Sequence, residues 1–425
     1  MPSKKPLRLI SLIGFGLAAT LATSACAGSA GAPQADPAAP VDLSFSNWQW
    51  LEAGKGEILW DSVKDYAGPN DNVTLTKVEA PYASYADKLN TEIGAKGGAD
   101  VLVLQDSQFA TLADAGALEP LDDVGDELGA ALNGSNDAGL VEDARYGFNW
   151  ERPGYALIYN KDLIASAGIE VPTTYPELLA AATAVQANLG ISGFAGRHQT
   201  AEVDGWTLEF ANWINGFGGA LSEDGELTIN SPENVEAAES FVELFTSGVV
   251  PVGDDASTFR AKFAQNQVGF LIDNAGVAVT LTSNPENLVT GQNLGAAPLP
   301  FTDPGSHTQL ILAVNANSKN KEAAKDFVRW ILSDEGQTAI RPALGASVLA
   351  TDTPPSAEFL AANPFAEEYL KLAQESTSSL IPGFETDSKA IWREVLSAVE
   401  GALVRGDDVK DAFDAVQDKV VNEFG

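Results

Sequence analysis

Residues 99–106 read ADVLVLQD, and this stretch decides the fold class. Val101–Leu104 is a run of apolar residues without polar alternation, which predicts a strand that is buried on both faces. Residues 83–96 and 107–116 on either side of it predict helices. Asp106 directly follows the strand, and open α/β sheets bind their ligands beyond the carboxyl ends of strands. Asp106 is therefore a candidate ligand-binding residue, with the N-cap of the next helix as its alternative role.

The same alternation of strands and helices continues in both directions along the chain. Further strands are predicted at residues 41–46, 73–79, 155–159, 268–272 and 310–314, and further helices at 175–189, 320–332, 365–377, 388–404 and 408–422. This order is typical of an α/β fold with largely parallel sheets. The 425 residues exceed what one small core organises, so we expect two lobes.

The N-terminus has the features of a signal peptide. Three cations, Lys4, Lys5 and Arg8, precede an apolar segment at 9–22, which is too short for a stable membrane-spanning helix. Small residues then lead to Cys26, the single cysteine of the chain. This arrangement resembles a bacterial lipoprotein signal, and the resemblance implies that Cys26 is lipidated and begins the mature chain.

The lipoprotein interpretation divides this region into a signal peptide at 1–25 and, at 26–40, a lipidated cysteine with a flexible tether of small residues and proline. It places the protein on the outer face of the cytoplasmic membrane, anchored there by the lipid. The alternative is an ordinary secretory signal that is cut near Ala25 or Ala27, with Cys26 incidental.

The charge balance limits the possible partners. The chain carries 59 acidic and 25 basic residues, a formal charge of −34. This argues against nucleic acid as a partner, because phosphate binding needs clustered Lys and Arg. It also argues against anchoring on anionic headgroups. With one cysteine the chain has no intrachain disulfide, so the fold depends on packing.

Several stretches, in order, resemble the extracellular solute-binding proteins of ABC importers, in the sugar-binding branch that includes the maltodextrin-binding protein. The residues that carry the resemblance are 99–106 with 112–121, 146–150 leading to 157–163, 259–270, 295–300, 318–336 and 391–393. Each motif alone is weak, whereas their order and spacing together are specific.

The resemblance implies a fold and a function. The fold is the two-lobed, type II periplasmic-binding-protein-like α/β fold with a three-crossing hinge. The implied N-terminal lobe is 41–146 plus 298–342, and the C-terminal lobe is 147–297 plus 350–425. A sugar would be captured between the lobes and delivered to the transmembrane permease subunits of an ABC transporter, by a monomer. The relative has a tryptophan near the position of Gly276, so the sugar stays open: mono-, di- or oligosaccharide.

A sugar site needs aromatic faces for stacking and carboxylates or amides that bind hydroxyl groups. Trp48 and Trp50 flank Gln49 after the first strand, and strand alternation would place both on one face, in a cleft or in the lobe core. Glu151 lies at a predicted hinge crossing, where it would bind hydroxyls or pair with Arg152.

Asp273 and Asn274 follow the strand at 268–272, in the same topological position as Asp106. Trp206 begins an aromatic stripe on a predicted helix and is the member of that stripe expected to reach the cleft, although such stripes usually form core. Trp392 lies where the resembling family has a stacking tryptophan. Trp60 and Trp330 are assigned to packing.

The sequence favours a binding protein over an enzyme. His198 and His307 lack metal-ligand spacing, and the chain contains no GxSxG, phosphate-binding or dinucleotide-binding loop. No metal or cofactor is predicted. An exported glycoside hydrolase is the enzyme alternative, because it needs only two carboxylates. A binder of a polyol, a polyamine or a peptide is the third class.

Overall fold

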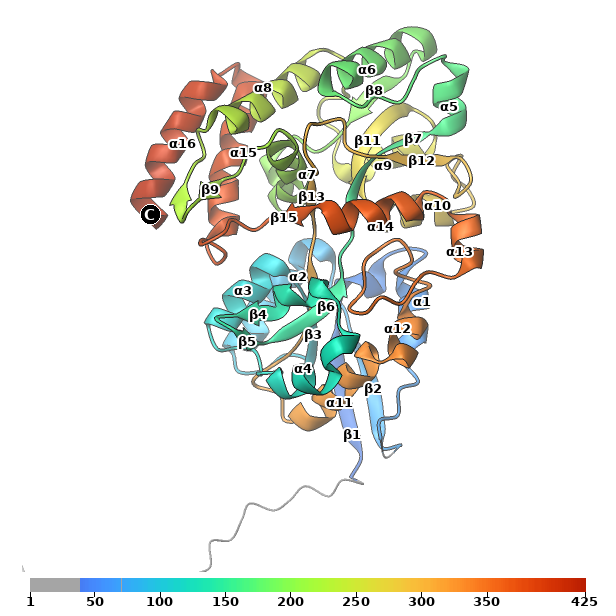
Figure 1. The fold of residues 1–425 in the computed structure, drawn as a ribbon, viewed down its shortest axis with the longest axis vertical. Helices are drawn as coiled ribbons and strands as arrows, with labels where there is room; N and C mark the ends of the chain where they lie inside the picture. The colour runs from blue at the N-terminus through green and yellow to red at the C-terminus, as the bar shows by residue number, and fades with distance from the viewer. Residues whose placement is uncertain (1–38, 70) are drawn as a thin grey trace, which may run out of the picture. The chain divides into compact units, whose positions relative to one another are not determined.

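The computed structural model describes residues 39–69 and 71–425. The predicted signal peptide, the lipidation site Cys26 and most of the predicted tether lie outside the described residues. Pro40–Gly425 forms one compact unit that contains two principal sheets, each in its own lobe (Figure 1). The predicted two-lobed α/β fold is confirmed.

The first lobe is built on a five-stranded sheet in the order β2-β1-β3-β14-β6. Its strands are β1 (Val41–Ser46), β2 (Val73–Val78), β3 (Val101–Gln105), β6 (Gly147–Glu151) and β14 (Leu310–Val314). Its helices are α1 (Gly56–Val63), α2 (Tyr82–Gly94), α3 (Asp106–Asp114), α4 (Asp122–Leu128), α11 (Lys321–Leu332) and α12 (Asp334–Ile340). The apolar run of β3 is buried on both faces, as its sequence predicts.

The second lobe is built on a four-stranded sheet in the order β12-β7-β11-β8. Its strands are β7 (Tyr155–Asn160), β8 (Ser192–Ala195), β11 (Val268–Asn274) and β12 (Leu294–Ala297). Its helices are α5 (Lys161–Ser166), α6 (Tyr175–Leu189), α7 (Val203–Gly216), α8 (Pro232–Thr246), α9 (Ala256–Ala264), α10 (Ala275–Ser283), α13 (Ala357–Ala362), α14 (Ala366–Glu375), α15 (Ser388–Arg405) and α16 (Val409–Phe424).

Short elements complete the described chain. They are the 3₁₀ helices η1 (Trp48–Leu51), η2 (Gly129–Ala131), η3 (Gly134–Gly139) and η4 (Thr200–Glu202) and the two-residue strands β4 (Leu140–Val141), β5 (Ala144–Arg145), β9 (Ser222–Glu223), β10 (Glu226–Leu227), β13 (Ser306–His307) and β15 (Thr377–Ser378).

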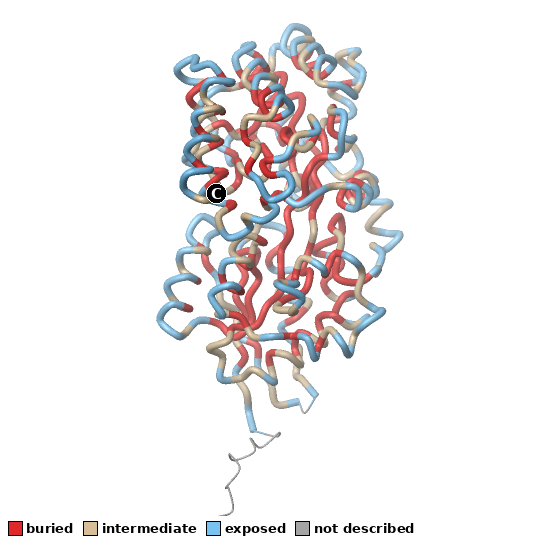
Figure 2. Tube along the Cα trace, turned by 60° about the vertical axis from the view of Figure 1, so that its left-hand side comes forward, coloured by how far each residue is buried: buried red, intermediate tan, exposed pale blue. Residues whose placement is uncertain are grey.

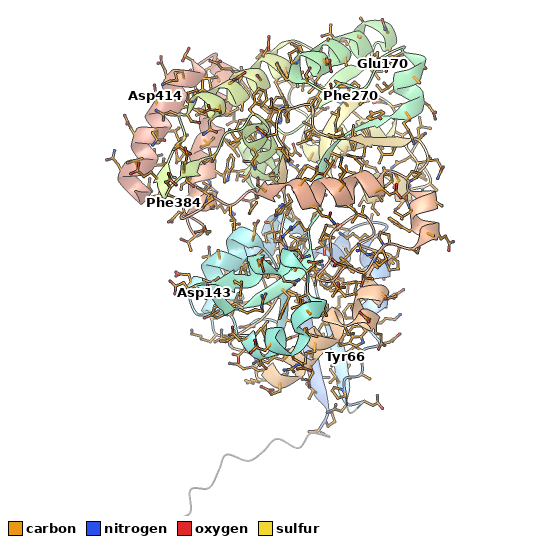
Figure 3. All side chains as sticks on the ribbon, in the orientation of Figure 1. Tyr66, Asp143, Glu170, Phe270, Phe384 and Asp414 are labelled. Carbon is orange, nitrogen blue, oxygen red and sulfur yellow. The ribbon has the colours of Figure 1, made fainter. Side chains whose placement is uncertain are left out.

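Buried segments follow the strands of both lobes, and exposed residues gather on the outer helices (Figure 2). Phe270 on β11 lies inside the second lobe, whereas Tyr66 lies at the far end of the first (Figure 3). Each sheet is therefore covered by its own helices and supports its own core.

The expectation of largely parallel sheets was wrong. In the first sheet β1 pairs parallel with β2 and β3, but β14 is antiparallel to both β3 and β6. In the second sheet β7 is antiparallel to both β11 and β12. The antiparallel strands lie next to the passages between the lobes, where the chain returns from one sheet and enters the other.

The chain passes between the sheets after β6, between β12 and β14, and after Ala350, where the first core ends. The sequence placed residues from 147 onward in the second lobe, but β6 pairs with β14 and belongs to the first sheet.

A buried polar network joins the three passages. Arg152 Nε donates to Gln309 Oε1 at 2.8 Å, and Gln309 Nε2 donates to Asn149 Oδ1 at 2.5 Å. Asn149 Nδ2 in turn donates to the carbonyl of Val348 at 3.0 Å. Each passage therefore contributes at least one residue to the same hydrogen-bond network, which links the three passages between the lobes.

Candidate functional site

A cavity with a volume of about 420 Å³ lies between the two lobes, and we call it the central chamber. The first lobe contributes Trp48, Gln49, Glu52, Lys55, Tyr82, Gln105 and Glu151, and the second contributes Tyr155, Arg197, Arg260, Asn274, Val277 and Thr280, among others. Its volume lies in the range of small-molecule binding sites, about 300–1,000 Å³. Charged, amide and aromatic side chains from both lobes therefore face one common space.

The first-lobe side of the chamber is organised around Glu151. Lys55 Nζ donates to its two carboxylate oxygens at 3.1 and 3.4 Å, and Gln49 Nε2 donates to Oε1 at 2.5 Å. Ser347 Oγ donates to Oε2 at 3.3 Å. Glu151 does not pair with Arg152, the alternative left open by the sequence. Its buried carboxylate instead holds Gln49 and Lys55 in position at the chamber wall.

Burial opposes the protonation of Lys55, but the charges of Glu151 and Glu52 outweigh it and raise the pKa of Lys55. Lys55 therefore stays cationic inside the wall. Burial also raises the pKa of Glu52, against the opposing effect of Lys55.

The second-lobe side contains two arginines and two acids. Arg260 binds Asp273 in a bidentate manner, with Nε to Oδ2 at 2.7 Å and Nη2 to Oδ1 at 2.9 Å. Arg197 pairs with Glu209, and its backbone N–H also donates to Glu209 Oε2 at 2.9 Å. Burial raises the pKa of Glu209, and the two arginines oppose that rise. Each guanidinium is thus matched by an acid of the same lobe.

Asp273 lies behind this wall instead of lining it. It is fully buried, and its carboxylate accepts from Arg260 and from the backbone N–H of Asn274 at 2.9 Å. Asn274 does line the chamber and also caps α10, because its Oδ1 accepts from Val277 N at 3.1 Å. Of the two residues predicted to bind ligand here, Asp273 orients Arg260 and Asn274 faces the chamber.

The prediction that Trp48 and Trp50 lie on one face was wrong. The residues form the 3₁₀ helix η1, not an extended strand, because the side chain of Asn47 accepts from Gln49 N and caps it. Trp48 lines the chamber, whereas Trp50 packs edge-on against Phe45 inside the first lobe. The expectation that Trp50 reaches the cleft was wrong.

Trp206 is also part of a core. Its side chain is fully buried and packs against Phe210 and Phe241 in the second lobe. The expectation that its place near the start of α7 would bring it to the cleft was wrong, because Trp206 faces Phe241 of α8 inside the lobe, as Phe210 and Trp213 of the same stripe do.

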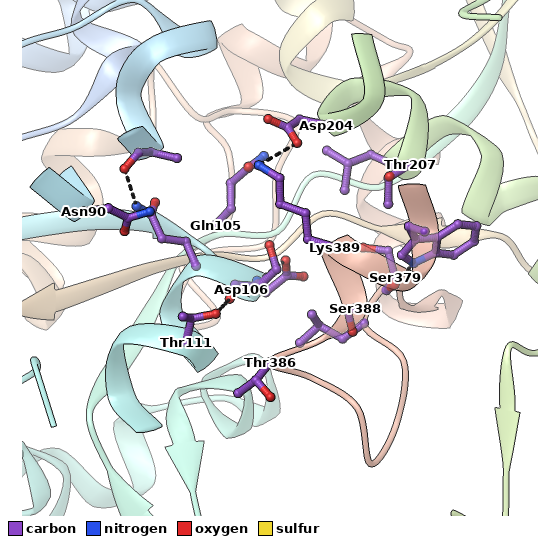
Figure 4. A pocket seen from close by; sticks show the side chains of 16 residues that line it. Asn90, Gln105, Asp106, Thr111, Asp204, Thr207, Ser379, Thr386, Ser388 and Lys389 are labelled. Atoms are coloured by element: carbon purple, nitrogen blue, oxygen red, sulfur yellow. Dashed lines mark hydrogen bonds and ion pairs between the residues drawn. The ribbon is translucent and has the colours of Figure 1, made fainter. Parts of the chain in front are cut away.

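A second, smaller cavity of about 130 Å³ lies beside the central chamber, and we call it the side chamber (Figure 4). Asp106, at the start of α3, lines it from the first lobe; Thr207, Lys389 and Trp392 line it from the second. Trp392 is only 3% exposed, and its indole N–H donates to the carbonyl of Ser379 at 3.0 Å. It lines the wall but offers no open stacking face.

Asp106 is the unusual group of the side chamber. It is 5% exposed, and its Oδ1 accepts from Ser107 N at 2.8 Å. Its Oδ2 has no hydrogen-bond partner among the described residues. Burial raises the pKa of Asp106 to about 6, although backbone N–H groups nearby lower it. The side chain of Asp106 therefore holds a buried acceptor that no described residue satisfies.

Sequence reasoning missed several residues that line these cavities. Arg197 closely follows β8, and Tyr82 follows β2, so the rule that pointed to Asp106 would have found both. Lys55 and Arg260 lie inside or beside helices and carry no such signal. Their place depends on how η1 and α9 pack.

No group of His, Cys, Asp and Glu side chains with the geometry of a metal site occurs among residues 39–69 and 71–425. Over the same residues, no helix is both long enough and apolar enough to span a bilayer.

Residues 50–338 match the family of bacterial extracellular solute-binding proteins. The chain belongs to this family. It is 26% identical over 321 residues to a binding protein of Brucella abortus (strain 2308), covering 73% of this chain and 74% of the relative. It is 24% identical over 318 residues to the diacetylchitobiose-binding protein DasA of Streptomyces coelicolor, covering 70% of this chain and 71% of that protein.

The fold is similar to that of maltose-bound MalE3 of T. maritima, with a TM-score of 0.79 and 22% identity, over 90% of this chain and all (100%) of that one. This member of the family of extracellular solute-binding proteins therefore has the fold that the sequence motifs predicted, with the chambers between its lobes.

Proposed function

We propose that the protein captures a neutral sugar between its lobes and delivers it to the permease of an ABC transporter. One observation carries the proposal: the three cations that line the central chamber are matched by acids of the protein. Lys55 pairs with Glu151, Arg197 with Glu209 and Arg260 with Asp273. An anionic solute would have to compete with these acids, whereas hydroxyl groups bind both members of such pairs.

The aromatic and amide groups of the chamber support the same class of solute. Tyr82 is 41% exposed, and its ring stands edge-on to that of Trp48 with 5.8 Å between centroids. An exposed ring of this kind stacks on the C–H face of a pyranose. Asn274 and Gln105 add donors and acceptors for hydroxyl groups. The relative DasA binds diacetylchitobiose and MalE3 was solved with maltose, which agrees with this choice.

We assign the solute-contacting roles to Trp48, Tyr82, Asp106, Lys55 and Asn274. Glu151 and Asp273 are positioning residues, because both are buried and act through the cations they bind. Trp392 contributes to the wall of the side chamber. The protein is then a binding protein without catalytic residues, and it works as a monomer.

The N-terminus completes the proposal. Cys26 is lipidated, the signal peptide is removed, and the lipid anchors the protein to the outer face of the cytoplasmic membrane. Fatty-acid labelling in cells is expected to mark the wild-type protein but not Cys26→Ser, which lacks the thiol that carries the lipid. An unlabelled wild-type protein, or equal labelling of the variant, would contradict lipid anchoring.

A thermal-shift screen tests the function. The purified protein is heated with mono-, di- and oligosaccharides, polyols, amino acids and polyamines, and each compound that raises the melting temperature is recovered and analysed. A ligand at a thousandfold excess over its Kd stabilises the folded state by about 4 kcal/mol. A sugar recovered intact supports the proposal. A hit with polyamines or peptides alone, or a sugar recovered cleaved, overturns it.

A further inference from the structure

One more cavity adjoins the chambers described above. A pocket of about 190 Å³, which we call the rim pocket, shares Trp48, Tyr82 and Gln105 with the central chamber. It also shares Gln105, Gln108 and Lys389 with the side chamber. Central chamber, rim pocket and side chamber are therefore neighbours along the interface between the lobes.

The side chamber has the character of a binding subsite. Its lining includes a carboxylate oxygen, Asp106 Oδ2, that is buried and has no hydrogen-bond partner within residues 39–69 and 71–425. A buried polar group without a partner is costly, and a carboxylate is more costly than a neutral group. A ligand hydroxyl that donates to Asp106 removes this cost. Thr207 (Figure 4) lines the same space with a hydroxyl group, and Gln108 lines it with an amide group.

The route between the chambers is also suited to a sugar chain. Tyr82 lies at the junction of the central chamber and the rim pocket, and its hydroxyl accepts from Gln105 Nε2 at 3.0 Å. Its ring is the large aromatic surface left open there, since Trp48 is only 6% exposed. A pyranose that leaves the central chamber passes over this ring before it reaches Asp106.

We propose that the solute is an oligosaccharide longer than a disaccharide, bound with one part in the central chamber and another in the side chamber at Asp106. This inference rests on the proposed function and narrows it, because a mono- or disaccharide in the central chamber alone leaves Asp106 Oδ2 unpaired. Chain length then contributes to selection, and short sugars bind weakly.

Isothermal titration calorimetry with length series tests the inference. The full chain is titrated with α-1,4-linked glucose, β-1,4-linked glucose and β-1,4-linked N-acetylglucosamine, each from the monosaccharide to the hexasaccharide. In the series that binds, we expect the affinity to rise about tenfold or more beyond the disaccharide. Equal affinity for the disaccharide and the longer sugars overturns the inference but leaves the proposed function intact. No binding in any series, together with a thermal-shift screen in which no sugar binds, overturns both.

A blocking variant locates the subsite. Thr207 lines the side chamber but not the central chamber, so Thr207→Trp fills the former. In this variant the tetrasaccharide is expected to bind no more tightly than the disaccharide does. Thr183→Trp is the matched control: Thr183 is an exposed residue of α6 in the same lobe, and its variant is expected to keep the full length dependence.

A gain with chain length that survives in Thr207→Trp overturns the inference. If this variant does not fold, Tyr82→Ala replaces it. This variant removes the ring between the chambers and is expected to weaken the tetrasaccharide by a larger factor than the disaccharide. Equal weakening of both sugars overturns the inference.

Discussion

Asp106 and Asp273 occupy the same topological position in the two lobes, but the structure gives them opposite environments. Asp106 follows β3 and begins α3, whereas Asp273 is the second-to-last residue of β11, just before α10. Asp273 is fully buried and is held by Arg260 through two hydrogen bonds. Asp106 is nearly as buried, yet its Oδ2 has no partner among the described residues.

The difference shows that a strand end marks where a ligand would bind but not which side chain binds it. Arg260 on α9 turns Asp273 into a positioning residue. In the first lobe no arginine or lysine forms an ion pair with Asp106 among the described residues, and the carboxylate stays available. The two aspartates therefore differ in role because Asp273 has an arginine partner and Asp106 has no cationic partner among the described residues, although both lie at the end of a strand.

The largest expected effect is on Asp273. Asp273→Asn removes the carboxylate that neutralises Arg260, and breaking a buried ion pair leaves the other charge uncompensated. We expect the free energy of unfolding to fall by about 3 kcal/mol, the lower end of the range for buried pairs, because Arg260 is partly exposed. Urea denaturation at pH 7 measures it. A loss below about 1 kcal/mol would mean that Glu209, whose Oε1 already lies 3.9 Å from Arg260 Nη2, compensates the charge of Arg260.

Substitution of Asp106 is expected to have the opposite effect on the free energy of unfolding at pH 7. The pKa of Asp106 is about 6 in the folded protein and about 3.9 when unfolded, so the folded state binds more protons between these values. Stability therefore falls as the pH rises through this window, by about 2–3 kcal/mol. Asp106→Asn is expected to remove that fall and to be more stable than the wild-type protein at pH 7.

Urea denaturation of both proteins at pH 4 and pH 7 checks this expectation. A variant that is less stable than the wild type at pH 7 would show that Asp106 has a structural partner. Asp273→Asn serves as the comparison, because it should be less stable than the wild type at that pH.

Ligand affinity extends the comparison. If a sugar hydroxyl donates to ionised Asp106, affinity is full above pH 6 and weakens as the carboxylate is protonated below it. At pH 5 we expect Kd to be about tenfold higher than at pH 7, equivalent to about 1.4 kcal/mol. Calorimetry at both values measures it, with the longest sugar that binds. Asp106→Asn should bind more weakly and show no such dependence; a variant with the same dependence would place the titrating group elsewhere.

The sequence predicted the fold well because the evidence for it is local. The apolar run of β3 and the alternation of strands with helices identify a two-lobed α/β protein without any knowledge of contacts. The direction of a strand in its sheet cannot be inferred from the local sequence. β14 is antiparallel to β3 and to β6 because the chain returns through the passages between the lobes.

The site was predicted less completely, for the same reason. Asp106, Glu151, Trp48, Asn274 and Trp392 do lie at the two chambers, each near a strand end or a family motif. Trp50 was misplaced because Asn47 caps a 3₁₀ turn that rotates it into the core. The cations that pair with the acids come from separate elements, and only tertiary packing brings them together.

The smallest expected effect on stability is that of the N-cap residues of α3 and α10. Asn274 Oδ1 accepts from Val277 N at 3.1 Å and caps α10, whereas Gln105, the N-cap residue of α3, forms no side-chain hydrogen bond of this kind. Asn274→Ala should therefore lower the free energy of unfolding by about 1 kcal/mol, and Gln105→Ala by much less. Denaturation of the two variants side by side measures the difference. Equal losses would mean that the hydrogen bond from Gln105 to Tyr82 stabilises the first lobe as strongly as a helix cap does. The environments at the ends of β3 and β11 would then differ less than those of Asp106 and Asp273 indicate.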